Sequence, residues 1–127
     1  MRNQIWGFIF VTSALLSACK TSTTATAQNN ALPNIKEVVN SNDVTLVDVR
    51  VPEQYKEGTA KNAINIPLAD IQSNIGSLKG KKVVVFCNKG IQADQAVQIL
   101  KKNGVDVYDG TSWKNVKAIQ EENAAPK

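Results

Sequence analysis

Residues 83–100 read VVVFCNKGIQADQAVQIL, and this stretch decides the fold. Its first four residues form a continuous apolar run rich in β-branched side chains, which is typical of a strand covered on both faces in a parallel sheet. Apolar residues then recur at helical spacing, at Ala93, Ala96, Val97 and Leu100. Lys101, Lys102 and Gly104 follow as signals for the end of a helix. The stretch therefore predicts a strand, a short polar loop and a helix.

Shorter apolar runs and helical spacings extend this alternation over most of the chain. Further strands are predicted at residues 44–47, 63–66 and 105–108. Further helices are predicted at residues 35–39, at residues 68–78 and after Ser112, where Val116 and Ile119 share a face. Alternating strands and helices are typical of an α/β domain with a mostly parallel sheet.

The composition fits one ordinary globular domain and limits its chemistry. The 127 residues carry a net charge of +4 and the basic residues are scattered, so no nucleic-acid partner is expected. The chain has no histidine, which excludes Ser-His-Asp and Cys-His hydrolases, histidine-ligated metals and a histidine base. Its two cysteines are too few for a four-thiolate zinc or iron–sulfur site. We therefore expect neither a metal nor a cofactor.

The N-terminus has the three parts of an export signal. Arg2 is positive, residues 5–16 are apolar, and small residues precede Cys19. A helix over that apolar stretch would span about 18 Å, short of the roughly 30 Å hydrocarbon core of a bilayer, so a permanent membrane span is the weaker interpretation. Residues 16–19, Leu-Ser-Ala-Cys, resemble the lipobox of bacterial lipoproteins, in which the cysteine is lipidated. A plain secreted protein with a coincidental cysteine is the alternative.

These signals divide the chain into four parts. The expected parts are a signal peptide at residues 1–18, a polar, flexible tether at residues 19–31, the globular domain at residues 32–120 and a frayed tail at residues 121–127. A lipidated Cys19 would anchor the exported domain to a bacterial membrane, with the domain in the periplasm. Lys20 directly after this cysteine favours the outer membrane.

Cys87 stands where a reactive group would be expected. It directly follows the apolar run at residues 83–86, and ligands of open α/β sheets bind at the carboxyl ends of strands. Free N–H groups of the loop and of the helix N-terminus favour an anion there, and hence the thiolate of Cys87. Lys89 could add to this field and Gly90 would let the loop turn back, whereas Asp94 opposes it. The other loop residues are Asn88, Ile91 and Gln92.

The alternative is a buried, inert cysteine at the end of a core strand. The polar, glycine-containing loop after Cys87 argues for exposure and favours a reactive thiol. Once Cys19 is lipidated, Cys87 has no partner for a disulfide within the chain. A thiol–disulfide oxidoreductase would usually carry a Cys-x-x-Cys pair, which this sequence lacks.

From about Leu32 to Gln120 the chain resembles a single rhodanese domain, the persulfide-forming sulfurtransferase module. Three groups of residues carry the resemblance, and their order and spacing make it specific. They are LVDVR at residues 46–50 with PEQY at 52–55, Gly58 with AINIP at 63–67, and VVFCNKG at 84–90 with Ala93, Ala96 and Leu100.

The resemblance implies a fold, a reaction and a set of site residues. The fold would be an α/β domain with a central, mostly parallel five-stranded sheet flanked by helices on both faces. In a ping-pong reaction, the Cys87 thiolate would take the outer sulfur of a donor such as thiosulfate and pass it to cyanide or a thiol. Residues 88–92 would bind the anionic groups. Asp48 and Arg50 would support the active loop, although a structural ion pair is an equal alternative. A protein could also serve as donor or acceptor.

Departures from the family pattern bear on activity. Asn88 and Gln92 stand where many active members carry basic residues, and Ala93 and Thr59 replace a common serine and histidine. Fewer positive charges weaken the binding of a dianionic donor, so we expect modest activity with thiosulfate, with a less charged or protein-bound sulfur donor as the alternative. A rhodanese-like module that binds a partner or carries sulfur without turnover is the alternative. Phosphatases and arsenate reductases of the same superfamily have a loop one residue longer that ends in arginine, which this chain lacks.

Overall fold

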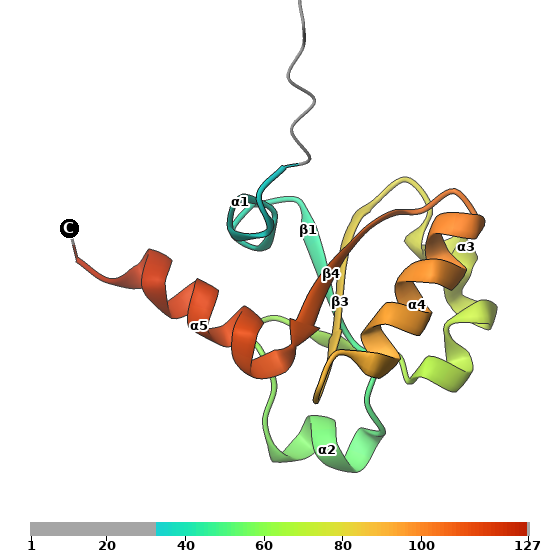
Figure 1. Ribbon diagram of the computed structural model, residues 1–127, viewed down its shortest axis with the longest axis horizontal. Coiled ribbons are helices and arrows are strands. Elements are labelled where there is room, and N and C mark those ends of the chain that lie inside the picture. Colours follow the sequence, from blue (N-terminus) through green and yellow to red (C-terminus); the bar gives the residue numbers. More distant parts are fainter. Residues whose placement is uncertain (1–32, 127) are drawn as a thin grey trace, which may run out of the picture.

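The computed structural model describes residues 33–126, which form a parallel sheet with helices on both faces (Figure 1). Four strands lie in the order β2-β1-β3-β4, and all neighbours pair in parallel. The strands are β1 (Val44–Asp48), β2 (Ile64–Asn65), β3 (Lys82–Cys87) and β4 (Asp106–Ser112). The helices are α1 (Ile35–Val39), α2 (Pro52–Glu57), α3 (Ile75–Leu78), α4 (Ile91–Lys102) and α5 (Trp113–Ala124), with 3₁₀ turns η1 (Leu68–Asp70) and η2 (Gln72–Asn74). The expected α/β fold is confirmed.

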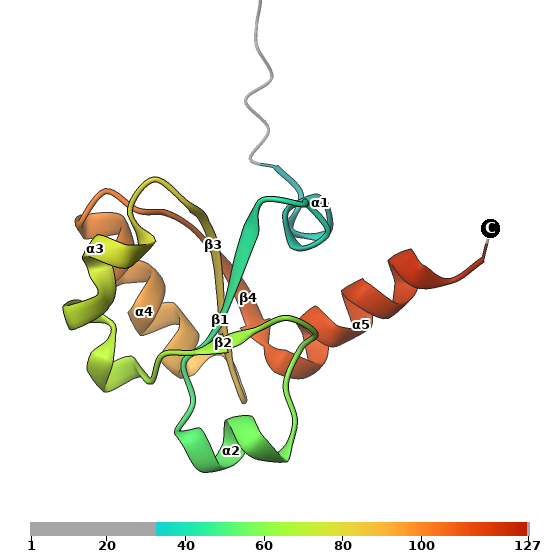
Figure 2. The same cartoon turned by 180° about the vertical axis from the view of Figure 1, so that it is seen from behind.

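Strand β3 is buried on both faces and separates two hydrophobic cores. Helices α3 and α4 lie on one side of the sheet, and α1 and α5 lie on the other (Figures 1 and 2). Because successive side chains of a strand point to opposite faces, Val83, Val85 and Cys87 pack into the core beneath α3 and α4. Val84 and Phe86 pack into the core beneath α1 and α5. This two-sided burial is the arrangement that the continuous apolar run predicts.

Helix α2 lies beyond the carboxyl ends of the central strands and so faces the region where a ligand would bind (Figure 2). The periodicity of the sequence does not reveal this helix, because none of the described residues of α2 is buried. A local signal is present nonetheless. Pro52 occupies the first helical turn, a position where its fixed φ angle is favourable and its missing N–H costs nothing.

The expected count of five strands is wrong for residues 33–126, in which four strands pair. Each of the four apolar runs forms a strand, but no fifth strand precedes α1 within the described residues. There, the Asn34 side chain caps the helix by accepting a hydrogen bond from the N–H of Lys36 at 3.1 Å. This part of the chain therefore begins with a helix.

The single helix expected over residues 68–78 is also wrong, since η1, η2 and the short α3 occupy that range. Side chains compete here for the backbone groups of a regular helix. The Asn74 amide donates to the carbonyl of Asp70 at 2.8 Å, and the Ser77 hydroxyl donates to the carbonyl of Asn74 at 2.8 Å. The apolar spacing still buries Ile71, Ile75 and Leu78, so the core face is as predicted although the helix is broken.

Helix α5 begins as expected and ends later than expected. Ser112 caps it by accepting a hydrogen bond from the N–H of Asn115 at 3.1 Å. The helix then continues to Ala124, past the tail boundary expected at residue 121. An exposed ion pair of 2.8 Å between Lys36 of α1 and Glu122 links this last part to the domain.

The expected signal peptide at residues 1–18, the tether at residues 19–31 and the lipidated Cys19 lie outside the described residues. Within residues 33–126, no helix combines the length and the apolar character needed to cross a bilayer.

We predict that Gly110→Ala destabilises the domain, because a Cβ atom at this position of β4 would lie 2.8 Å from methyl groups of Val84 and Val116. Overpacking of this kind lowers the free energy of unfolding by about 1–3 kcal/mol, and urea denaturation should show a correspondingly lower midpoint concentration. Gly76→Ala in α3 is the matched control, since nothing lies within 4 Å of the position that its added methyl group would occupy. Equal midpoints for the two variants would contradict the close packing of β4.

Candidate active site

Cys87 is the last residue of β3, and its sulfur receives hydrogen bonds from the loop that follows. The backbone N–H of Gly90 donates to Sγ at 3.0 Å, and the N–H of Ala93 donates to it at 3.4 Å. The loop thus turns back over the sulfur, and α4 begins at Ile91. Cys87 is only 2% exposed, so the exposure expected from the polar loop is wrong: the loop turns back and covers the sulfur. The sulfur is nevertheless held by polar donors and is not enclosed by hydrocarbon alone.

Gly90 has a backbone conformation that lets the loop make this turn. Its φ angle is +96°, in the left-handed region that glycine adopts at little cost. A Cβ atom here would also lie 3.0 Å from the Cγ2 atom of Thr111 on β4. Both the dihedral angle and the close packing therefore require glycine at this position.

Strand β4 supplies a second contact to the sulfur through a β-bulge. Gly110 is an extra residue between the paired positions Val85–Asp109 and Phe86–Thr111. Thr111 has a φ angle of +67°, which is unusual for a β-branched residue, and its N–H donates to the Asp109 carboxylate at 2.7 Å. The Thr111 carbonyl accepts a hydrogen bond from the Cys87 thiol at 3.6 Å. The bulge thus places a hydrogen-bond acceptor beside the thiol form of Cys87.

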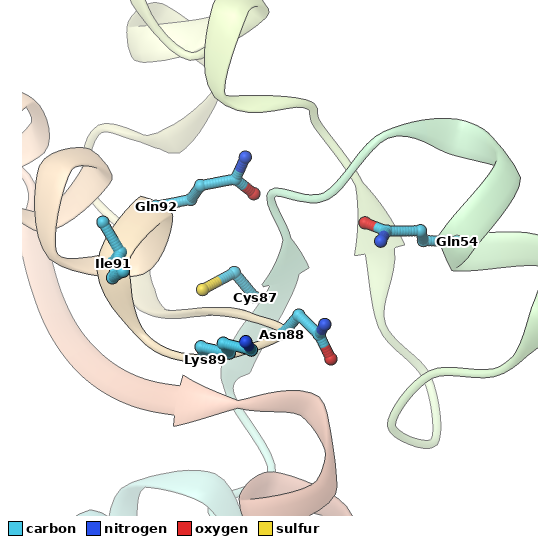
Figure 3. Close-up of a pocket in the computed structure, with 6 residues that line it drawn as sticks. All are labelled: Gln54, Cys87, Asn88, Lys89, Ile91 and Gln92. Atoms are coloured by element: carbon cyan, nitrogen blue, oxygen red, sulfur yellow. The ribbon is translucent and has the colours of Figure 1, made fainter.

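A cavity of about 350 Å³ opens beside Cys87. It is lined by Gln54, Cys87, Asn88, Lys89, Ile91 and Gln92 (Figure 3). Gln54 comes from α2 and Gln92 from α4, and their amide groups point toward each other across the cavity (Figure 3). A volume of this size is at the small end of ligand pockets and suits a small molecule or the end of a larger one.

The electrostatic field at the cavity is mildly positive. Cys87 lies at the N-terminus of α4, whose aligned peptide dipoles amount to about half a positive charge at that end. Lys89 is the only cationic side chain among the described residues that line the cavity. Asp94 lies in the first turn of α4 and partly offsets this field. The arrangement favours an anion beside Cys87 and can hold a sulfur nucleophile.

Asp48 and Arg50 form a buried ion pair that does not line this cavity. The two side chains belong to residues that are 0% and 4% exposed, and Arg50 Nη2 lies 2.7 Å from Asp48 Oδ2. Further bonds connect the pair to the chain beyond α2: Arg50 donates to the carbonyl of Gly58 at 2.6 Å, and the Thr59 hydroxyl donates to Asp48 at 2.8 Å. Of the two interpretations left open by the sequence, the contacts of this pair match the structural one.

The structure brings all of the predicted loop residues together around Cys87. Asn88, Lys89, Ile91 and Gln92 line the cavity, and Gly90 donates to the sulfur. Sequence reasoning missed two participants in the site, which are Gln54 and the carbonyl of Thr111. The N–H of Ala93 is one of the helix N-terminal donors that it expected. The Asp-Gly pair before Thr111 is a turn signal and could have indicated the bulge.

Comparison with known proteins agrees with this geometry. A model of the rhodanese-like domain family matches residues 32–117, which is more than half of the chain. Among curated proteins, the chain is 44% identical over 61 residues to thiosulfate sulfurtransferase PspE of Escherichia coli, covering 46% of this chain and 59% of that protein. It is 38% identical over 68 residues to an HTH-type transcriptional regulator of Mycobacterium tuberculosis, covering 51% of this chain and 30% of the regulator.

Among solved structures, the chain is similar to one titled as a rhodanese with anions from E. coli, with 38% identity and a TM-score of 0.54. The match covers 57% of this chain and 89% of the chain in that structure. The chain thus spans less than two thirds of the curated relatives above. The match of the family model, together with the parallel sheet and the cysteine at the end of β3, shows that the chain belongs to the rhodanese-like domain family.

Proposed function

We propose that this protein is a sulfurtransferase that carries a sulfane sulfur on Cys87 as a persulfide and passes it to a thiol or to cyanide. One observation carries the proposal above the others. The sulfur of Cys87 accepts two backbone hydrogen bonds at the edge of an open cavity, from Gly90 and Ala93. Such donors stabilise a negative charge, both on the attacking thiolate and on the persulfide that replaces it.

The first half-reaction needs no oxidant or cofactor. The Cys87 thiolate attacks the outer sulfur of thiosulfate, a new S–S bond forms, and the bond between the two sulfurs of thiosulfate breaks. Sulfite leaves with the electron pair of the broken bond, and the product is an anionic Cys87 persulfide. The total charge is unchanged, because the thiolate charge now lies on the terminal sulfur.

The second half-reaction returns the enzyme to its starting state. A thiolate or cyanide attacks the terminal sulfur of the persulfide, and Cys87 leaves as a thiolate that is again stabilised by the two loop amides. In its thiol form, Cys87 donates a hydrogen bond to the carbonyl of Thr111. Both half-reactions use the same cavity, which fits a ping-pong order.

The relatives support the same reaction class. PspE is named as a thiosulfate sulfurtransferase, and the similar E. coli structure is titled as a rhodanese with anions. The N-terminus of α4 and Lys89 offer this chain a place for an anion beside Cys87. The M. tuberculosis relative is named as a regulator, so a rhodanese-like region also occurs in a protein that is not named as a sulfurtransferase. Catalytic turnover of a sulfur donor is therefore the property that distinguishes a sulfurtransferase from a non-catalytic rhodanese-like module.

We also propose where the reaction takes place. The apolar stretch at residues 5–16 and the Leu-Ser-Ala-Cys sequence at residues 16–19 support export and lipidation at Cys19. The domain would then act in the periplasm on a membrane-attached tether, and Lys20 favours the outer membrane. Radiolabelled fatty acid should label the wild-type protein in cells and should not label a Cys19→Ser variant.

We predict that the purified protein gains the mass of one sulfur atom when it is incubated with thiosulfate, and that cyanide reverses the gain. Cys87→Ala should abolish both the mass gain and the formation of thiocyanate, because no other described residue carries a thiol. Cys19→Ser is the matched control and should retain both. Intact-mass spectrometry and a colorimetric thiocyanate assay provide the measurements.

Two outcomes would contradict the proposed function. Retention of thiocyanate formation by Cys87→Ala would mean that the sulfur is carried elsewhere. The absence of any mass gain with every small sulfane donor would favour the non-catalytic module.

We predict that Gly90→Ala slows persulfide formation by about tenfold or more. When the backbone leaves its left-handed conformation, the loop amides no longer point at Sγ and their hydrogen bonds to it are lost. Gly80→Ala is the matched control: its φ angle is +76°, but nothing lies within 4 Å of the position of the added methyl group. Both variants should lose about 1–2 kcal/mol of stability from the strained dihedral angle, and Gly90→Ala should lose more because its methyl group also meets Thr111. Only Gly90→Ala should slow the gain of sulfur mass, measured in samples quenched at successive times. A wild-type rate of persulfide formation in Gly90→Ala would show that the loop amides do not contribute to the reaction.

A further inference from the structure

Ile91 presents a large apolar surface to water at the mouth of the cavity. It is the first residue of α4 and is 69% exposed, compared with 47% for Val51 and 45% for Ile64, the other exposed large apolar residues of the described chain. Ile91 also lines the cavity that contains Cys87. A bound molecule that covers this side chain removes apolar surface from water, which favours binding.

The polar side chains of the cavity are almost all neutral. Gln54, Asn88 and Gln92 offer amide groups, and Lys89 is the only cation among the described lining residues. Figure 3 shows the amides of Gln54 and Gln92 directed toward each other, so they can hydrogen-bond a ligand between them. Amides provide donors and acceptors but no net charge.

A simple charge balance then distinguishes between classes of donor. The N-terminus of α4 and Lys89 together supply about one and a half positive charges, and Asp94 in the first turn of α4 offsets part of them. The Cys87 thiolate with thiosulfate brings three negative charges into the cavity, whereas the thiolate with a singly charged donor brings two. The smaller excess of negative charge costs less when water is displaced from the cavity.

We propose that the preferred donor is a singly charged organic sulfane compound. Its apolar organic group belongs to the leaving group, on the far side of the S–S bond from the terminal sulfur, and contacts Ile91. This inference rests on the proposed function and names the substrate class of the same site. Organic thiosulfonates and organic persulfides share this chemistry. Cys87 attacks the terminal sulfur, the S–S bond of the donor breaks, and a sulfinate or a thiolate leaves with the electron pair.

The test compares kcat/KM for thiosulfate, methanethiosulfonate and benzenethiosulfonate, with cyanide as acceptor. We expect kcat/KM to rise in that order as charge is lost and apolar area is gained. Ile91→Ser should lower kcat/KM for benzenethiosulfonate about tenfold and lower that for thiosulfate by a much smaller factor. Ile64→Ser removes another exposed isoleucine, one that does not line the cavity, and should change neither value.

Gln92→Lys provides the reciprocal test, because it adds a cation to the cavity wall. It should raise kcat/KM for thiosulfate about tenfold and that for benzenethiosulfonate by a smaller factor, because the dianion gains more from the added charge than the monoanion does. An alkyl persulfide in the same assay distinguishes the two classes of organic donor.

Equal kcat/KM values for the three donors, or an Ile91→Ser variant that loses activity equally with all of them, would overturn this inference while leaving the proposed function intact. The absence of turnover with every donor would instead remove the proposed function itself. The two failures are therefore distinguishable in one set of measurements.

Discussion

The hydrogen bonds from Gly90 and Ala93 to the sulfur of Cys87 are the interactions on which the site depends. They exist because β3 ends at the sulfur and α4 begins four residues later, so the intervening loop must fold back over the strand end. The strand is fixed by side chains packed on both of its faces, with Val84, Val85 and Phe86 fully buried. A rigid strand end allows short backbone bonds to hold one atom in place, which is the condition for electrostatic preorganisation.

The β4 bulge adds a third backbone contact to the sulfur. The carbonyl of Thr111 accepts a hydrogen bond from the thiol form of Cys87, whereas the amides of Gly90 and Ala93 donate hydrogen bonds that favour negative charge on the sulfur. Thr111 adopts its positive φ angle because its N–H bonds to the Asp109 carboxylate and Gly110 is packed tightly between β3 and α5. Local strain in β4 thus helps a single sulfur atom to be accommodated in both of its protonation states.

Features encoded in contiguous residues were predictable from the sequence, and features assembled from distant ones were not. The apolar run before Cys87 and the helical stripe after it predict β3, the loop and α4, because burial of each follows from its own periodicity. Gln54 was missed because it lies on a helix without buried residues, where no periodic signal exists. The carbonyl of Thr111 was missed because backbone direction in a bulge depends on strand register. The prediction of a single helix over residues 68–78 was wrong because apolar spacing specifies which face is buried. It does not specify that the helical hydrogen bonds continue without a break.

The buried pair of Asp48 and Arg50 connects this fold to the selectivity of the cavity. Helix α2 has no buried residue of its own, so core packing alone does not fix its position. Arg50 precedes the helix and Gly58 caps its end, and the guanidinium of Arg50 bonds to the carbonyl of Gly58 at 2.6 Å. The pair therefore holds both ends of α2 together and attaches them to the end of β1. Gln54 projects from α2 into the cavity. The ion pair of Asp48 and Arg50 therefore helps to position a lining residue of the cavity, although the pair itself does not line it.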